Sequence, residues 1–221
     1  MTIQDIIRRV RVVLNHDPNV VALTEFEDED VALQIDDIIR GHIEPAARLT
    51  VLEAPAEYLT YSSQTTSTYV GGHREVTIDA SAIRLGRAMV AGWSGPVYVE
   101  RFVEPFSEEH LRQYGEFNGL KATSREPVVV VMTRNSGWEL HLFGGITEDA
   151  QTTSVTYVTS PKITPASQSA VESISIDSRL EDALVNHVAA LTSESLGDSN
   201  KYKELMGLAA GLANANNTSD E

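Results

Sequence analysis

The sequence contains no cysteine, and this absence excludes disulfide bonds and thiolate metal centres from all 221 residues. Aromatic residues are scarce at 6% of the chain, which disfavours a carbohydrate-binding surface built from clustered aromatic rings. No apolar run approaches the roughly 20 residues that span a bilayer, so we predict no membrane anchor. With 42% hydrophobic residues, the chain can still bury a substantial core.

Basic residues are few compared with acidic ones. The chain has 17 Lys and Arg against 32 Asp and Glu, which gives a formal net charge of −15. Sequence-independent binding to a phosphate backbone needs clustered Lys and Arg, so we expect no binding to nucleic acid. Asp5, Arg8, Arg9 and Arg11 occupy the place where a signal peptide has its apolar core. We therefore expect a soluble protein that is made inside a cell.

Sequence motifs for chemistry are also missing. Gly92–Gly95 is one residue short of a nucleophile elbow and is interpreted as a turn that packs Trp93 into the core. The acidic run Glu25–Asp30 lacks the central glycine of a calcium loop and is interpreted as a helix start. No two histidines have a metal-binding spacing such as H-E-x-x-H, so each is interpreted as an ordinary surface or partly buried residue. The six histidines are His16, His42, His73, His110, His141 and His187. We predict no catalytic residue, no cofactor and no metal site.

Apolar residues recur at a helical period near both ends of the chain. The opening stripe includes Ile3, Ile6, Ile7 and Val10, at the i, i+3, i+4, i+7 spacing of an amphipathic helix. Capping residues and helix-ending Pro or Gly mark the boundaries. The predicted helices cover residues 2–16, 27–47, 178–196 and 199–215.

The middle of the chain, residues 48–165, has the alternation and turn residues of short strands. The clearest hairpin joins residues 127–133 to 138–143, and further strands are predicted over 97–103 and 155–159. The Ser/Thr-rich segment from Tyr58 to Val70, followed by Gly71-Gly72, predicts a strand that turns back onto Glu75–Ile78, or a flexible loop. Residues 82–90 fit a helix or a strand. A short helix capped by Ser107 is predicted up to Tyr114, and residues 161–169 are predicted to be a polar linker.

These elements predict an α+β fold in which a terminal α-helical bundle carries an inserted β-rich domain. The predicted division is residues 1–48 for the N-terminal helices, 49–165 for the insertion, 166–215 for the C-terminal helices and 216–221 for a disordered tail. The predicted bundle core is Ile6, Ile7, Val10, Ile35, Ile38, Ile39, Leu184, Val188, Leu191, Leu205, Ala209 and Leu212.

The last predicted helix carries glycines at positions 207 and 211. Each interior glycine costs on the order of 1 kcal/mol of helix stability relative to alanine. A close-packed neighbour would offset this loss. That neighbour is either another helix of the same chain or another subunit.

Several ordered segments resemble one family. In chain order they give an aspartate-containing segment with an Arg-Leu pair, a tryptophan, a short helix with a glutamine, and a strand led by proline. This order resembles the neck ring proteins of tailed bacteriophages, in particular those of crAss-like phages, and the helical ends are similar to the head–tail adaptor fold. The segments are Val76–Leu85, Trp93, Pro96–Val99, Ser107–Tyr114, Asn118 and Glu126–Val129.

The resemblance implies a structural virion protein of the neck, made in the host bacterial cytoplasm. It implies a homo-oligomeric ring, a dodecamer, that extends the DNA channel below the portal protein and docks other neck and tail ring proteins. The net charge of −15 agrees with a channel through which DNA passes without being held. We expect carboxylates from the runs at residues 25–30 or 104–109, or from an inserted β loop, to face that channel. The alternative is that these runs lie on the outer wall and only keep the particle soluble.

Two other classes of function compete with a head–tail connector. One is a β-sandwich module that binds a carbohydrate or receptor, for which clustered exposed aromatic residues would be the signal. The other is a hydrolase with a dispersed site, for which a cluster of groups with perturbed pKa values in a deep pocket would be the signal.

Overall fold

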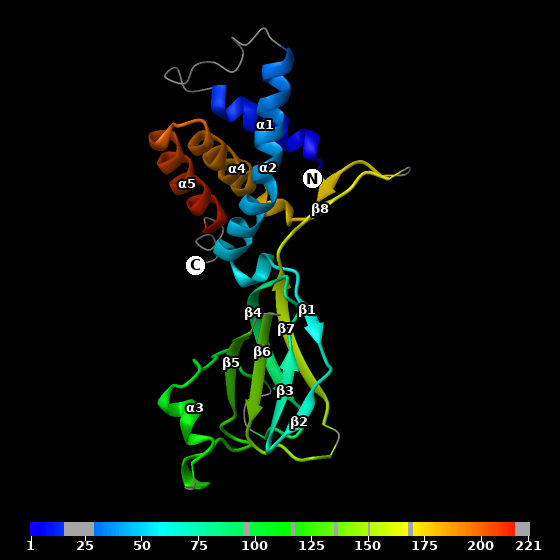
Figure 1. Ribbon diagram of the computed structural model, residues 1–221, viewed down its shortest axis with the longest axis vertical. Helices are drawn as coiled ribbons and strands as arrows, with labels where there is room; N and C mark the ends of the chain where they lie inside the picture. Colours follow the sequence, from blue (N-terminus) through cyan, green and yellow to red (C-terminus); the bar gives the residue numbers. More distant parts are fainter. Residues whose placement is uncertain are drawn as a thin grey trace, which may run out of the picture. The chain divides into compact units, whose positions relative to one another are not determined.

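The computed structural model describes residues 1–15, 29–94, 98–115, 118–134, 137–149, 151–167 and 170–214. The chain divides into two compact units. One joins Met1–Leu59 to Ser160–Glu221, and the other is the continuous segment Thr60–Thr159. The first unit is mainly helical and the second is built of strands (Figure 1). The predicted α+β class is therefore confirmed, with helices near both ends of the chain.

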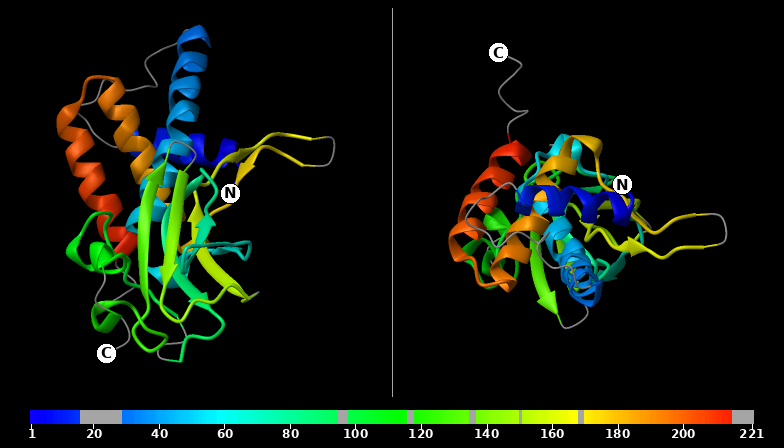
Figure 2. Two further views of the ribbon diagram at one scale, coloured as in Figure 1. Left: turned by 60° about the horizontal axis from the view of Figure 1, so that its bottom comes forward. Right: turned by 90° about the horizontal axis from the view of Figure 1, so that it is seen from above.

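The helical unit is organised around one central helix, α4, which contacts α1, α2 and α5. Every residue of α4 from Ala183 to Ala190 is buried. A helix that is buried all round lies inside a bundle rather than on its surface. The right-hand panel of Figure 2 shows α4 and α5 packed side by side. The four helices are α1 (Ile3–Asn15), α2 (Glu29–Glu53), α4 (Glu181–Ser195) and α5 (Ser199–Asn214). Two short 3-10 helices, Ala56–Tyr58 and Ser178–Leu180, flank α2 and α4.

The second helix is longer than predicted. The sequence placed its end at residue 47, but α2 continues through Pro45 to Glu53. A proline inside a helix costs about 3 kcal/mol because it removes a hydrogen bond. Ala46, Ala47 and Val51, all buried, continue the apolar stripe beyond the proline and offset that cost. The helix thus occupies residues that the sequence had placed in the β-rich insertion.

The predicted core of the bundle is largely confirmed, with three corrections. Ile38, Leu191 and Leu212 are only half-buried. On α2 the buried row is Ile35, Ile39 and Ile43, spaced four residues apart, and Ile38 lies beside that row. The predicted core residues that are buried are Ile6, Ile7, Val10, Ile35, Ile39, Leu184, Val188, Leu205 and Ala209.

A buried histidine and a buried threonine pair inside this core. The His187 side chain has no exposed surface, and its Nδ1 is 2.9 Å from the Thr50 hydroxyl oxygen. The Thr50 hydroxyl is also 2.9 Å from the Ala46 carbonyl oxygen, and His187 Nε2 is 3.2 Å from a Glu53 carboxylate oxygen. Burial lowers the pKa of His187, and Glu53 opposes this effect. The imidazole is therefore held neutral between α2 and α4 at pH 7.

We expect the helical unit to lose stability as the pH falls below about 6.5. The unfolded chain takes up a proton at the ordinary pKa of histidine, 6.5, whereas the folded chain, with its lowered pKa, resists protonation. The slope should reach at most about 1.4 kcal/mol per pH unit for this one proton. Urea unfolding between pH of about 7.5 and 5.5 measures it, followed by the helical circular dichroism signal. His187→Gln should flatten the slope, and an unchanged slope would contradict the assignment.

The segment predicted as a polar linker carries a small sheet. β8 (Ile163–Thr164) pairs antiparallel with β9 (Ser173–Ile174) in the arm drawn in yellow in Figure 1. Ile174 is buried in the bundle core, and Ser173 forms an isolated bridge with Thr2. Ile163 of the predicted linker also packs against this core, so apolar contacts order a segment that its polar composition did not indicate.

The β-rich unit consists of two antiparallel sheets with one core between them. Buried Val76, Leu140, Ala88 and Val155 come from both sheets and belong to one cluster.

The three-stranded sheet has the order β1 (Ser62–Gln64), β7 (Thr153–Thr159), β4 (Ala82–Val90). The four-stranded sheet has the order β2 (Thr68–Val70), β3 (His73–Thr77), β6 (Gly137–Phe143), β5 (Val128–Arg134). Both predicted hairpins, β2–β3 around Gly71-Gly72 and β5–β6, are confirmed. Figure 2 shows β5 and β6 as a long antiparallel pair.

The predicted strand over residues 97–103 is wrong as a continuous strand. Residue 97 lies outside the described residues. Val99 bridges to Ala88 in the three-stranded sheet, and Val103 bridges to Val130 in the four-stranded sheet. The segment therefore crosses from one sheet to the other and covers the edge strands β4 and β5, which its alternation alone could not reveal. It leads into α3 (Glu108–Arg112), with Ser107 as the predicted cap, and then to a 3-10 helix, Asn118–Leu120.

Candidate functional site on the outer face of the four-stranded sheet

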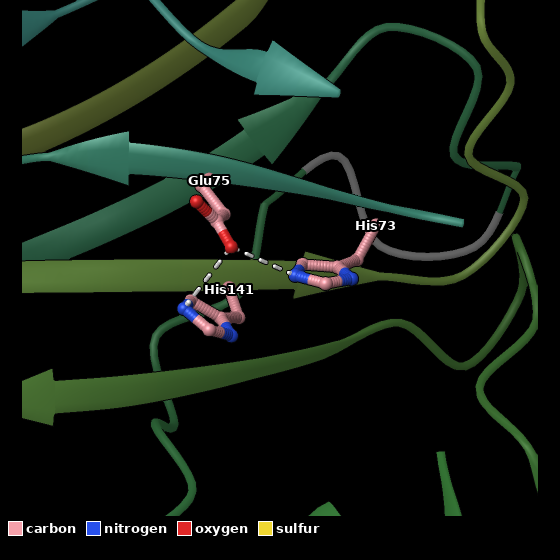
Figure 3. A group of neighbouring side chains, drawn as sticks. All are labelled: His73, Glu75 and His141. Atoms are coloured by element: carbon pink, nitrogen blue, oxygen red, sulfur yellow. Dashed lines mark hydrogen bonds and ion pairs between the residues drawn. The ribbon is translucent and has the colours of Figure 1, made fainter. Parts of the chain in front are cut away.

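The antiparallel pairing of β3 with β6 gathers titratable side chains on one face of the sheet. Side chains alternate between the two faces of a strand. Leu140 and Leu142 of β6 belong to the core between the sheets, so His141 takes the opposite face. His73 and Glu75 share a face of β3, and Glu75 pairs directly with His141. Figure 3 shows the three side chains converging.

Two imidazole rings share one carboxylate oxygen. The Nε2 atom of His73 is 3.3 Å from Glu75 Oε1, and the Nε2 atom of His141 is 3.7 Å from the same oxygen (Figure 3). Glu139, two residues before His141 on β6, places its Oε1 atom 2.8 Å from the same His141 nitrogen. Arg134 of β5 in turn contacts Glu139 at 2.6 Å. In this cluster nitrogen-bearing side chains and carboxylates thus follow one another in turn across β3, β6 and β5.

Aromatic rings from α3 and β6 cover the cluster. His73 stacks on His141 and on Phe143, with ring centroids 4.8 Å apart in both pairs. Tyr114, just after α3, meets His73 edge-on at 6.3 Å and His110 at 5.4 Å. The rings exclude water from the imidazoles, so the His73 and His141 side chains are only 6% and 8% exposed, whereas Glu75 is 27% exposed.

The turn before α3 fixes the orientation of His110. The His110 backbone N–H donates to the Ser107 hydroxyl, which caps the helix. The Phe106 N–H donates to His110 Nδ1 at 2.9 Å, so the proton of the neutral ring lies on Nε2. Phe106 has a φ of 61°, in the left-handed region that a residue other than glycine rarely adopts. The backbone strain at Phe106 thus accompanies the contact that aims His110 at the cluster.

The surroundings of His73 and His110 favour their neutral forms. Burial lowers the pKa of His73, and His141 adds to the lowering, while a hydrogen bond to Glu75 opposes it. Burial also lowers the pKa of His110, with His141 again contributing. Burial raises the pKa of Tyr114, and Glu75 adds to this effect. At pH 7 the His73 and His110 rings therefore stay unprotonated, and an unprotonated imidazole nitrogen beside a carboxylate is a donor for a cation.

A family model described as SU10 adaptor protein matches residues 1–220. The chain belongs to the SU10 adaptor protein family. The head–tail adaptor character expected from the resemblance is confirmed at this level: this is a phage structural protein of head–tail joining, from a family of virion adaptors and not of enzymes. No curated protein matches the chain. Among the described residues no helix is long and apolar enough to cross a membrane.

The sequence carried a signal for the cluster that the helical spacing H-E-x-x-H does not include. His73 and Glu75 are two residues apart, and so are Glu139 and His141. Two such pairs on antiparallel strands face each other when the register aligns them. The register itself could not be predicted, because β3 was expected to pair only with the preceding strand, whereas it also pairs with β6, more than sixty residues later in the chain.

The other sequence features have ordinary structural roles where they are described. Trp93 packs against the core of the β-rich unit and its Nε1–H donates to the Gly144 carbonyl oxygen at 2.8 Å, which confirms its interpretation as a core residue after a turn. Gly95 of that motif lies outside the described residues. Of the acidic run at residues 25–30, only Glu29 and Asp30 are described, at the start of α2.

Within the described part of the chain, the glycines of α5 do not pack against another helix. No described heavy atom lies within 4 Å of a Cβ built on Gly207 or Gly211. The buried face of α5 is formed by Leu205, Ala209 and Ala213 instead. Of the two alternatives that the sequence left open, a neighbouring helix of the same chain is thus not found among the described residues, and another subunit remains. The glycine face is exposed, together with Leu208, whose side chain is 50% exposed.

Proposed function

We propose that the chain forms a closed ring in the phage neck, below the portal protein, and extends the channel through which genome DNA passes. The observation that carries the proposal is the adaptor-family match over residues 1–220. The helical unit supports it, because segments from both ends of the chain build one bundle, as the head–tail adaptor resemblance implies. In this proposal the ring has twelve copies, as many as the portal. The chain would share its place in the neck with the ring proteins of crAss-like phages.

The charge of the chain suits a channel wall. A net charge of −15 repels phosphate and releases no counterions on contact with DNA. The carboxylates at residues 104–109 include Glu108 and Glu109, which are exposed on α3. The other predicted run, at residues 25–30, lies mostly outside the described residues. We propose that one of these runs faces the bore and that the ring docks other neck and tail proteins by its rims.

The exposed face of α5 is the surface we propose for contact between subunits. A helix with glycine on its solvent side lets a second backbone approach closely. Leu208 adds an apolar side chain between Gly207 and Gly211. Each interior glycine lowers helix stability by about 1 kcal/mol relative to alanine, and contact with a neighbouring subunit at this face would offset that loss.

The ring is tested by mixing the purified chain with portal protein of the same phage. We expect the chain alone to be monomeric and the mixture to contain twelve copies per portal ring, counted by mass photometry. Gly207→Leu should weaken ring formation at least about tenfold, because the new side chain blocks the close approach of a neighbour. It should not unfold the chain, since leucine favours helix more than glycine does and the site is open.

A matched control is Gly41→Leu. Gly41 is also a helical glycine with no described atom within 4 Å of its Cβ, but it lies on α2. This variant should assemble as the unmodified chain does. Equal weakening by both variants would remove α5 from the interface. A chain that stays monomeric or forms a two-fold dimer with its portal present would contradict the ring.

A receptor- or carbohydrate-binding module is the second candidate, because the insertion is a β-sandwich with exposed aromatic residues near α3. Phe106 and Tyr114 are 75% and 58% exposed. The family match favours the connector over this candidate. Binding of the isolated chain to host-cell glycans, lost in Phe106→Ala, would favour it.

A further inference from the structure

We propose that His73, Glu75 and His141 bind a divalent transition-metal ion, and that Zn²⁺ fits them best. The ion would join β3 to β6 under the cover of α3. This inference replaces the prediction of no metal site, and it does not depend on the ring. It rests on the distances between the donor atoms, on their chemistry and on the burial of both rings.

Two of the three separations between the donor atoms are close to those around a tetrahedral ion. Two ligands each about 2.0–2.1 Å from zinc lie about 3.4 Å apart at the tetrahedral angle. The His73 Nε2 atom is 3.3 Å from Glu75 Oε1, and the His141 Nε2 atom is 3.7 Å from it. All three donor atoms lie within 4.8 Å of one another. In the proposed site the side chains close around the ion by rotation about their own bonds, and the paired strands β3 and β6 hold their Cα positions.

The chemistry of the donors selects the class of ion. Calcium and magnesium prefer sites made of oxygen, whereas imidazole nitrogen suits zinc and related transition metals. Two imidazoles with one carboxylate form a set that zinc accepts, with a fourth position left for water or another residue. Glu139 is placed to take it, because its Oε1 atom is 2.8 Å from the His141 donor atom. Its contact with Arg134 would then hold the fourth ligand in position.

The expected affinity depends on the second ring nitrogen of each histidine, the one that does not face the ion. Histidine ligands of tight sites donate their second N–H to a carboxylate or a carbonyl, and loss of such a partner weakens binding about 10–100-fold. The Nδ1 atoms of His73 and His141 are buried and have no hydrogen-bond partner in the described part of the chain. We therefore expect binding weaker than in structural zinc sites with complete outer shells. Glu75, 27% exposed, gives the ion a way in from solvent.

The rival explanation is a network of histidine–carboxylate hydrogen bonds that needs no ion. Such a network would use the same His73–Glu75 and His141–Glu139 contacts. It does not require two nitrogens to approach one oxygen. The two explanations differ in whether added metal binds to the folded chain at this place.

The experiment uses the full chain without a histidine tag, treated with a chelator and then exchanged into metal-free buffer. Zn²⁺ is titrated by calorimetry, and Co²⁺ by its visible absorption, which reports tetrahedral nitrogen and oxygen ligands. We expect one ion per chain and, with saturating Zn²⁺, a rise of about 5 °C or more in the melting temperature of the β-rich unit. Tryptophan fluorescence follows that unit, because Trp93 and Trp138 both lie in it.

Glu75→Gln and His141→Gln should each weaken Zn²⁺ binding at least about tenfold and remove the cobalt absorption. Glu75 is partly exposed, so Glu75→Gln keeps the test valid if His141→Gln does not fold. His42→Gln is the matched control, because His42 lies in the helical unit and contacts Ser195. It should bind as the unmodified chain does. Absence of binding, or equal binding by all variants, would leave only the hydrogen-bonded network and overturn the proposal.

Discussion

Replacing Ile39 with alanine is expected to lower the free energy of unfolding of the helical unit by about 2–5 kcal/mol. The Ile39 side chain is fully buried in the cluster that α1, α2, α4 and α5 share. Removing it forfeits the transfer of its methylene and methyl groups from water and leaves a cavity among neighbours that are held by their own packing. Urea unfolding followed by the helical circular dichroism signal measures the loss, because the helices lie mostly in this unit.

Ile38→Ala provides the matched control for this substitution. Ile38 has the same side chain, on the same helix, one residue earlier, but it is only half-buried. We expect its truncation to cost about 1 kcal/mol or less, because less apolar surface returns to water and the space left is open to solvent. If the two variants lost equal stability, the orientation of α2 in the bundle would be wrong.

Gly144→Ala is expected to destabilise the β-rich unit by about 2–4 kcal/mol. Gly144 follows β6 with a φ of 108°, a conformation that a residue with a Cβ adopts only under strain. An added Cβ would lie 2.5 Å from the carbonyl oxygen of Thr123, a backbone atom that cannot move aside cheaply. The carbonyl of Gly144 also accepts the hydrogen bond from Trp93, so a shift of this turn would disturb the core.

Tryptophan fluorescence during urea unfolding measures the effect, since both tryptophans report on this unit. Gly119→Ala is the comparison, because no described atom lies within 4 Å of its Cβ and its φ is not positive. It should change stability by less than about 1 kcal/mol. A Gly144→Ala variant that unfolds at the same urea concentration as the unmodified chain would show that the turn adapts.

The helices were predictable because their evidence is local. α1, α4 and α5 begin and end close to the predicted residues, since caps and apolar stripes lie within one element. The end of α2 was not predictable from Pro45 alone, because packing of Ala46, Ala47 and Val51 beyond it decided where the helix stops. Local propensity gives way to tertiary burial at such positions.

The strands show the same limit over longer distances. The β5–β6 hairpin was predictable because its two strands are adjacent in sequence. The segment containing Val99 and Val103 alternates as a strand does, yet divides its pairing between two sheets, and only the arrangement of those sheets determines this. The histidine–carboxylate cluster depends on the register of β3 with β6, which is a long-range pairing that no local pattern specifies.

The way β1 and β7 pair has a consequence for the order of folding. Ser62, near the start of the β-rich unit, pairs with Tyr157, near its end. Once this unit has folded, the two chain segments that lead into the helical unit leave it as neighbours. The entropic cost of closing a loop grows as about (3/2)RT ln n, so reducing a loop of about 100 residues to about 10 saves roughly 2 kcal/mol. Early folding of the middle of the chain thus prepares α4 and α5, which follow it in sequence, to meet α1 and α2, which precede it.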